Sequence, residues 1–381
     1  MPIEGDISVS LLWDGRRVRQ VGVRSTRPAL AARVAVGRSP AEATRLLPSL
    51  FAICGQAQGA AAAGALRAAG AEPADIPELA VWTVPLEAAQ ETFWRMLIDA
   101  PRALALAPQA AAVAGARAAV AQAIAALRVS PSAPKAALAA AAAALDALAR
   151  DHVYGRDAAA WVAETDLAAF DRWRATTSTL PARMLAIIAA TAPRLGRSDT
   201  ALMPGLDDDG WWSKVVPALQ SEAAFAQAPT WNGEPVETGA LARTHAHPLV
   251  AALIERDGRS AATRIAARLV ELAGLLDALR GGDADAARWV QAWPLGPGEG
   301  LAAAQTARGL LVHHARLGEG RVTGYRIVAP TDWNFHPEGA LARGLVGTEA
   351  GDEATLRKLA GVAVQALDPC VACRVEVQRH A

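Results

Sequence analysis

Three cysteines give this 381-residue chain its clearest chemistry, and two of them form a Cys-x-x-Cys pair. Cys370 and Cys373 stand in LDPCVAC near one end of the chain, and Cys54 stands in FAICGQA near the other. Two thiols at this spacing, taken without context, fit half of a zinc site as well as any other centre, and Cys54 alone would be a small buried apolar residue. The first stretch, however, has the form of a second Cys-x-x-Cys that ends in Ala57. We therefore expect the two ends of the chain to meet at one thiolate-lined pocket.

The composition argues against several classes of protein. The formal net charge is zero, which gives no electrostatic case for binding nucleic acid or an anionic membrane. The first residues are acidic and lack the apolar segment of a signal peptide. The most apolar runs, such as residues 136–149, are alanine-rich and too short to span a bilayer. An odd number of cysteines without a secretory signal predicts a cytoplasmic protein that has no disulfide framework.

The first elements that must position Cys54 follow from local patterns. Alternating apolar residues over 7–23 predict an N-terminal β-hairpin. Ser39 is followed by Pro40 and, three positions after the serine, by Glu42, which is the pattern of a capped helix start. We expect that helix to end near Cys54.

The rest of the chain is predicted to be mainly helical. Apolar residues at helical spacing indicate a helical body over about 40–281. A second β-hairpin is expected at 309–329, and a helix at about 351–366 leads into the tail at 367–381, which holds the Cys-x-x-Cys pair. The prediction is thus a single compact α+β domain, residues 1–381, in which helices predominate.

Seven short segments stand in an order that a known family shares. They are Ile3-Glu4-Gly5, Gly37-Arg38-Ser39-Pro40, Ile53-Cys54-Gly55-Gln56-Ala57, Glu237-Thr238-Gly239-Ala240-Leu241-Ala242-Arg243, Thr306-Ala307-Arg308-Gly309, Pro330-Thr331-Asp332-Trp333-Asn334 and Asp368-Pro369-Cys370-Val371-Ala372-Cys373. In the same order they resemble the motifs I/V-E-G, G-R-D-P, I-C-G-V-C, E-x-G-P-L-A-R, A-P-R-G, P-S/T-x-W-N and D-P-C-x-x-C of the large subunit of nickel–iron hydrogenases. Each match is weak by itself, but chance would have to supply the order as well.

The departures from that family concern the metal ligands. In the enzymes four cysteines hold nickel and the second of each pair bridges to iron, whereas here one bridging position is Ala57. Ala52 replaces the arginine before the first cysteine motif, and Glu376 stands where the enzymes have a histidine. A glutamate that helps to bind magnesium or iron falls at Ala32. This pattern resembles the HupK/HoxV-type maturation proteins, which look like large subunits.

The resemblance carries several expectations. It implies a trimmed hydrogenase large-subunit fold and a non-enzymatic role as scaffold or carrier of the Fe(CN)2CO group during hydrogenase maturation, without nickel. Its iron ligands would be Cys54, Cys370 and Cys373. Its partners would be a HypC-type chaperone, the HypC–HypD complex and, as a further candidate, the hydrogenase large-subunit precursor.

The chemistry of the cargo is compatible with three thiols. Ferrous iron that carries CO and two cyanides needs only two or three more donors, and thiolates suit it. We predict that the three sulfurs lie roughly 3–4 Å apart, as ligands of one ion would. The resemblance places Arg308 and Thr331 where they would donate hydrogen bonds to the cyanide nitrogens, and Asp368 could anchor Arg308 or a backbone amide.

Other interpretations stay open. The chain could be a divergent hydrogenase-like redox enzyme with an incomplete cysteine ligand set, or a metal-free decoy that only binds chaperones. Arg308 could form a plain salt bridge, and Glu4 could be structural instead of passing protons. His313 and His314 are adjacent on a predicted strand and point to opposite faces, so we interpret both as structural.

Overall fold

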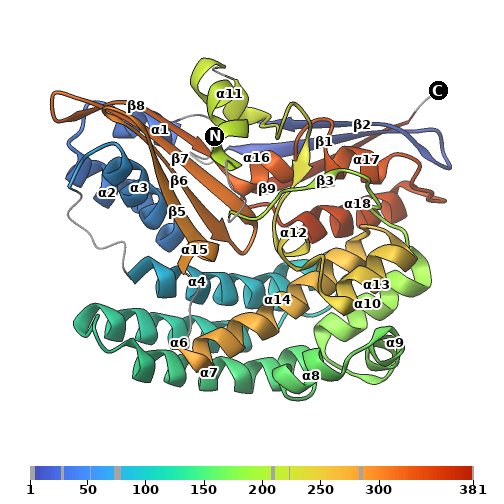
Figure 1. Ribbon diagram of the computed structural model, residues 1–381. Helices are drawn as coiled ribbons and strands as arrows, with labels where there is room; N and C mark the ends of the chain where they lie inside the picture. Colours follow the sequence, from blue (N-terminus) through green and yellow to red (C-terminus); the bar gives the residue numbers. More distant parts are fainter. Residues whose placement is uncertain are drawn as a thin grey trace.

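The computed structural model of this protein describes seven stretches of the chain. They are residues 5–26, 30–51, 53–72, 79–206, 211–222, 224–282 and 286–379. Helices predominate and pack against two larger β-sheets, which confirms the expected fold class (Figure 1). Glu4 and Ala52, which stand at family positions, lie outside the described residues.

The first sheet joins the two ends of the chain. Strands β1 (Asp6–Trp13) and β2 (Val18–Ser25) form the predicted antiparallel hairpin, and every second residue of β1 is buried. Strand β9 (Ala372–Arg379) then pairs with β1 in parallel, so that the sheet order is β2-β1-β9. The sequence did not predict this pairing, which fixes the tail after the Cys-x-x-Cys motif onto the start of the chain.

The second sheet has four antiparallel strands in sequence order. The predicted C-terminal hairpin is present as β7 (Gly309–Gly318) and β8 (Arg321–Val328). The sequence missed two further strands, β5 (Val290–Gly296) and β6 (Glu299–Thr306), which extend it. The tight β6–β7 turn carries Arg308, and its position therefore depends on the whole sheet.

Helix α3 (Gly55–Ala68) lies directly on the four-stranded sheet (Figure 1). The close packing is possible because both surfaces carry small side chains. A Cβ atom built at Gly300 would stand 2.3 Å from the carbonyl oxygen of Ala65, so this strand position requires glycine. The C-terminal half of α3 is consequently held close against the sheet.

Cys54 is the residue that precedes α3. Helix α2 (Pro40–Ser49) has the predicted capping box, in which the side chains of Ser39 and Glu42 satisfy each other's backbone amides. The expectation that Cys54 would end this helix is wrong, because α2 ends five residues earlier and Cys54 instead occupies the N-cap position of α3.

The remaining described elements are mostly helices. Their bounds are α1 Leu30–Ala35, α4 Ala80–Trp94, a π-helical turn Arg95–Asp99, α5 Ala100–Ala103, α6 Ala110–Val129, α7 Pro134–Ala149, a second π-helical turn Arg150–Tyr154, α8 Ala158–Glu164, α9 Leu167–Thr176, α10 Leu180–Thr191, β3 Ala201–Leu202, a 3-10 turn Trp211–Lys214, α11 Val216–Ser221, a 3-10 turn Phe225–Gln227, β4 Val236–Glu237, α12 Ala240–Thr244, α13 Pro248–Asp257, α14 Ala261–Gly281, α15 Ala286–Trp289, α16 Pro330–Asn334, α17 Ala340–Leu345 and α18 Glu353–Leu367.

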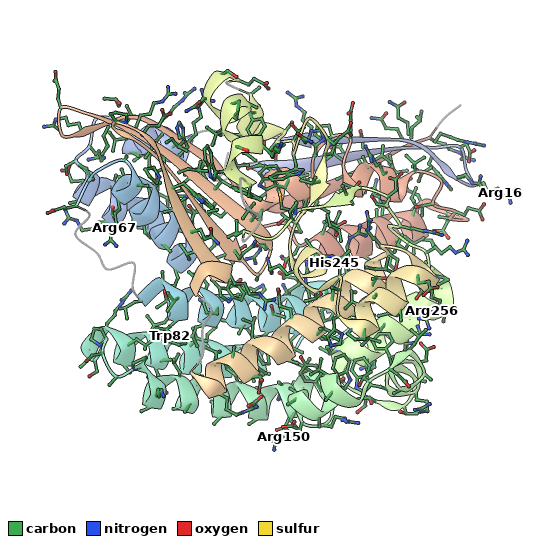
Figure 2. The ribbon with its side chains drawn as sticks, viewed as in Figure 1. Arg16, Arg67, Trp82, Arg150, His245 and Arg256 are labelled. Atoms are coloured by element: carbon green, nitrogen blue, oxygen red, sulfur yellow. The ribbon has the colours of Figure 1, made fainter. Side chains whose placement is uncertain are left out.

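Helix α14 runs through the largest apolar core, and α18 packs against it. Helices α6 and α7 form an antiparallel pair on the outside of α4 and α14 (Figure 1). By length and composition α6 is the described helix that could cross a membrane, yet it packs against α4 and α7 through one apolar face. Charged side chains such as Arg16, Arg150 and Arg256 stand at the periphery (Figure 2).

Candidate metal centre

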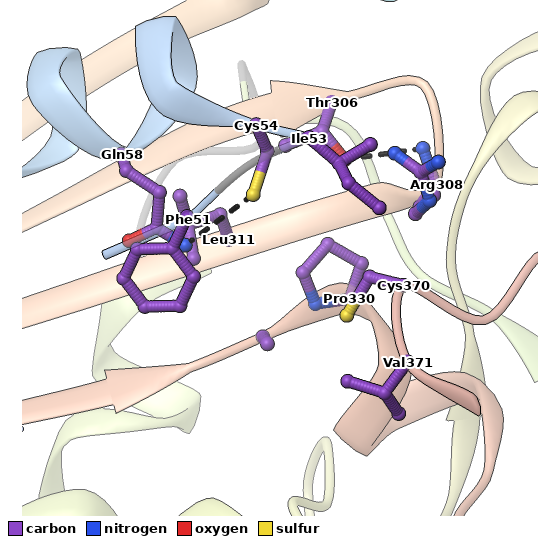
Figure 3. A pocket seen from close by; sticks show the side chains of 11 residues that line it. Phe51, Ile53, Cys54, Gln58, Thr306, Arg308, Leu311, Pro330, Cys370 and Val371 are labelled. Carbon is purple, nitrogen blue, oxygen red and sulfur yellow. Dashed lines mark hydrogen bonds between the residues drawn. The ribbon is translucent and has the colours of Figure 1, made fainter. Parts of the chain in front are cut away.

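Cys54 and Cys370 line one small cavity, although they come from opposite ends of the chain (Figure 3). The cavity lies between the start of α3, the β6–β7 turn and the segment after α18. Its lining is Phe51, Ile53, Cys54, Gln58, Thr306, Arg308, Leu311, Ala329, Pro330, Cys370 and Val371. The free volume is about 20 Å³, which is room for roughly one water molecule.

The Cys54 thiol resists ionisation in this environment. Burial raises the pKa of Cys54 to about 12, and the negative charges of Glu87 and Cys370 add to the effect. The charge of Arg308 and a hydrogen bond from the Gln58 amide to the sulfur, at 3.6 Å, oppose it. Cys54 is therefore a protonated thiol at neutral pH until a cation or metal stabilises its thiolate.

A buried carboxylate occupies the N-terminus of α3 next to this thiol. Glu87, on α4, accepts backbone hydrogen bonds from Gln56 at 2.8 Å and from Ala57 at 3.1 Å. A helix N-terminus favours an anion, and Glu87 satisfies it. Burial nevertheless raises the pKa of Glu87 to about 7, and the neighbouring charge of Glu91 acts in the same direction.

The Cys370 sulfur is held by a threonine from helix α16. The Thr331 hydroxyl donates to Cys370 Sγ at 2.9 Å, and the Cys370 backbone amide donates to the same hydroxyl oxygen at 3.1 Å. The start of α16 is itself fixed, because the Asp332 carboxylate accepts from the Ala329 amide at 2.9 Å. Thr331 thus positions the sulfur in this structure, and its predicted hydrogen bond to a cyanide stays a prediction.

Arg308 lines the cavity and is buried together with two acidic partners. Its Nη2 lies 3.1 Å from Glu91 Oε2, and its Nε lies 3.3 Å from Asp368 Oδ1. Burial disfavours the cation, yet the charges of Asp368 and Glu91 outweigh it and raise the pKa of Arg308. The Nε–H is buried without an aligned hydrogen-bond acceptor. The salt bridges of the simpler interpretation are therefore present, and Arg308 also brings a positive charge to the cavity that the two thiols line.

Asp368 connects three guanidinium groups at the end of α18. It forms ion pairs with Arg95 and Arg308, and its Oδ2 lies 3.6 Å from Arg268 Nη2. Burial alone would raise the pKa of Asp368, but these three cations hold it below its usual range. The predicted anchoring of Arg308 by Asp368 is thus present. Asp368 has a left-handed backbone conformation, with φ of 58°, which turns the chain from α18 toward Cys370.

Arg95 and Arg268 also bind the chain that leads to Cys370. The Arg95 Nη2 atom donates to the Pro369 carbonyl oxygen at 2.9 Å. Arg268 donates to the carbonyl oxygens of Gln365 at 3.3 Å and Ala366 at 3.0 Å, which are among the free acceptors of the last turn of α18. The same cations that balance Asp368 therefore fix the backbone on its N-terminal and C-terminal sides.

Cys373 does not line this cavity, contrary to the expectation of three gathered sulfurs. It lies on β9 opposite Ile7 of β1, and its side chain packs on the core side of the first sheet with Val375. Burial raises the pKa of Cys373 to about 12, and the second cause is the charge of Asp6 rather than the other thiols. Within the described stretches no group of three or more His, Cys, Asp or Glu side chains could hold a metal ion. The sequence could not foresee that β9 begins at Ala372, two residues after Cys370, and includes Cys373 in its pairing with β1.

Several important residues carry no motif that sequence analysis could use. Glu87 and Glu91 stand one helical turn apart on α4, so both face the pocket side, but their role depends on where α3 and Arg308 lie. Arg95 belongs to the π-helical turn after α4, a feature that often marks functional positions. Arg268 sits inside the otherwise apolar α14, and a charged residue in a buried helix is the signal that could have identified it.

Comparisons with known proteins identify the family and the fold. The family model for nickel-dependent hydrogenases matches residues 249–376. The hydrogenase expression/formation protein HoxV of Cupriavidus necator is 34% identical and covers 93% of this chain and 92% of its own. HupK of Rhizobium leguminosarum bv. viciae is 32% identical over 99% of this chain and 98% of its own. The Ni-Fe-Se hydrogenase from D. vulgaris Hildenborough superposes with a TM-score of 0.58 over 93% of each chain, at 17% identity.

The architecture is accordingly that of a hydrogenase large subunit. Within that class the sequence relationship is more specific. The chain belongs to the HoxV/HupK family of hydrogenase expression/formation proteins.

We expect Asp368→Asn to destabilise the protein far more than the same change at the other end of α18. Asparagine keeps the left-handed backbone but leaves three buried guanidinium groups with too little negative charge, which should lower the free energy of unfolding by about 3–5 kcal/mol. Asp352→Asn is the matched control, because Asp352 is the exposed N-cap of α18 and asparagine caps a helix equally well. Urea denaturation at pH 7 measures both. Similar small losses would mean that Asp368 is not an essential counter-ion.

We expect Glu87 to make the stability of the protein depend on pH. Below pH 4.5 Glu87 is protonated in both the folded and the unfolded protein. Between pH 4.5 and about 7 it ionises in the unfolded protein but keeps its proton in the folded one, so the free energy of unfolding falls. Above about pH 7 Glu87 is ionised in both states, and this contribution levels off. The loss should be on the order of 3 kcal/mol at about 1.4 kcal/mol per pH unit. Glu87→Gln should flatten this part of the profile, and exposed Glu72→Gln should not. Identical profiles for all three proteins would contradict the assignment.

Proposed function

We propose that this protein is a non-enzymatic carrier of the Fe(CN)2CO group in hydrogenase maturation, and that Cys54 and Cys370 hold the iron. One observation supports this most directly: two thiols from opposite ends of the chain face one cavity beside the buried Arg308. The names of its relatives, hydrogenase expression/formation proteins, support the maturation role.

The donor set suits this cargo. Iron with one CO and two cyanides has three ligands already, so two thiolates make five and leave one position for a further ligand. The two cyanides and two thiolates make the assembly anionic around ferrous iron. The guanidinium of Arg308 balances that charge, and we propose that it also donates a hydrogen bond to a cyanide nitrogen.

Holding the cargo requires the pocket to change. A free volume of about 20 Å³ is too small for iron with three diatomic ligands, so the walls must separate on loading. The cations and Thr331 fix the Cys370 side through many hydrogen bonds, whereas Phe51 and Ile53 contribute only apolar side chains. We infer that the segment that carries Phe51 and Ile53 moves.

The high pKa of Cys54 favours a carrier over a permanent site. Binding iron must displace a proton from this thiol, and each pH unit below its pKa costs about 1.4 kcal/mol. A partner that returns a proton to Cys54 would therefore help to release the iron. The free energy needed to deprotonate Cys54 weakens iron binding, which would be a disadvantage in a permanent metal site but helps a transfer protein to release its iron.

The ligand set argues against the rival redox enzyme. Ala57 stands at a bridging position of the enzyme motif, and a methyl group donates nothing to a metal. Cys373 lies outside the cavity in this structure, so two thiols are present where the enzymes use four. We propose that no nickel is bound, and that delivery involves a HypC-type chaperone, the HypC–HypD complex and the hydrogenase large-subunit precursor in the cytoplasm.

Iron content tests the proposal. The protein is produced anaerobically with the maturation proteins, purified, and analysed for iron and nickel beside three single variants. Cys54→Ala and Cys370→Ala each remove a donor to the iron, so we expect iron to fall by more than the 10–100-fold that changes around metal ligands produce. Cys373→Ala should keep most of the iron, because this thiol packs in the core of the first sheet.

The same preparations separate the rival functions. Stoichiometric nickel together with hydrogen-dependent dye reduction would establish the redox enzyme. Absence of iron from the wild-type protein, with the chaperone still bound, would establish the metal-free decoy. Loss of iron in Cys373→Ala equal to that in Cys370→Ala would contradict the two-thiol site but not the carrier role.

A further inference from the structure

A buried chain of polar side chains leads from the Cys54 sulfur into the four-stranded sheet. Gln58, one turn further along α3, places its Nε2 atom 3.6 Å from Cys54 Sγ (Figure 3). Its Oε1 atom lies 2.9 Å from His313 Nε2, and His313 Nδ1 lies 2.8 Å from the Tyr325 hydroxyl. Gln58, His313 and Tyr325 are all at least nine-tenths buried. His313, for which the sequence predicted a structural role, is thus hydrogen-bonded to Gln58, which in turn contacts the Cys54 thiol.

The directions of these hydrogen bonds depend on one another. With the Gln58 amide nitrogen on the sulfur, its oxygen must accept from His313, so the ring carries its hydrogen on Nε2. Nδ1 is then an acceptor, and Tyr325 donates to it. Burial lowers the pKa of His313 to about 3 and raises the pKa of Tyr325, so the ring stays neutral and the phenol keeps its proton. Every hydrogen in the chain thus points toward Cys54.

Such an arrangement favours a sulfur that only accepts. A thiolate, free or bound to a metal, accepts a hydrogen bond and has none to donate, whereas a thiol competes to donate its own. Three residues from α3, β7 and β8 are therefore arranged to donate toward the Cys54 sulfur when it is a thiolate. Donation to the Cys54 sulfur is useful only if a bound metal stabilises its thiolate form.

We propose that Gln58, oriented by His313 and Tyr325, is a positioning residue that donates to the Cys54 thiolate and weakens its electron donation to bound iron. The proposed effect on iron binding rests on the carrier function, but the hydrogen bond from Gln58 to Cys54 can be tested in the metal-free protein. A weaker donor is easier to exchange, which suits a thiolate that must later give up its metal.

The first test uses the metal-free protein. The rate of Cys54 alkylation by iodoacetamide at fixed pH, followed by mass spectrometry of its peptide, is proportional to the thiolate fraction. Removing a hydrogen bond to the charged sulfur in Gln58→Leu should slow it about tenfold or more. Tyr325→Phe removes only the last donor and should slow it less. Gln56→Leu, whose side chain lies toward a different cavity, should alkylate at the wild-type rate.

The second test uses the loaded protein. Without the Gln58 hydrogen bond the thiolate donates more electron density to iron, so the CO and CN stretching bands should move to lower frequency in Gln58→Leu and stay in place in Gln56→Leu. Wild-type alkylation rates in folded Gln58→Leu and Tyr325→Phe would overturn the proposal. If Gln58→Leu does not fold, the decision rests on Tyr325→Phe alone. Slower alkylation in a protein that never binds iron would support the hydrogen bond and refute the carrier function instead.

Discussion

The position of the candidate metal centre depends on one buried carboxylate, Asp368, which is surrounded by three guanidinium groups. Asp368 has almost no contact with solvent and meets Arg95, Arg268 and Arg308, which come from the turn after α4, from α14 and from the β6–β7 turn. Removing any of these charges from water costs several kcal/mol unless partners compensate it. The end of α18 can therefore dock in only one place. That docking puts Cys370, two residues further on, opposite the start of α3 and Cys54.

The same charges give the cavity its chemical character. Arg308 is shared between the structural ion pairs and the lining of the cavity, so the group that holds the fold together also supplies positive charge beside two thiols. Glu87 satisfies the N-terminus of α3, and with burial it keeps Cys54 protonated when no metal is present. The hydrogen-bonded sulfur of Cys370 and the protonated sulfur of Cys54 are consistent with the proposed uptake and release of an anionic iron group.

The fold was more predictable than the site. The β1–β2 hairpin, the Ser39 cap and helices α14 and α18 follow local patterns, and the family motifs located Cys54, Cys370, Arg308 and Asp368 in advance. The parallel β1–β9 pairing could not be predicted, because it joins the two ends of the chain and leaves no local signal. For that reason the sequence did not predict that Cys373 lies outside the lining of the cavity. Glu87 and Gln58 were missed because an isolated acidic or amide residue on a helix acquires meaning only from its neighbours in space.

The most direct test of the account is an infrared spectrum of the wild-type protein, purified anaerobically after coexpression with the maturation proteins. Bound CO and cyanide absorb in a region where the polypeptide does not. Iron held by Cys54 and Cys370 should give one CO band and two CN bands, and these bands should be absent when the same protein is produced without the maturation proteins. A spectrum without these bands, from protein that still forms its complex with the chaperone, would contradict the carrier function.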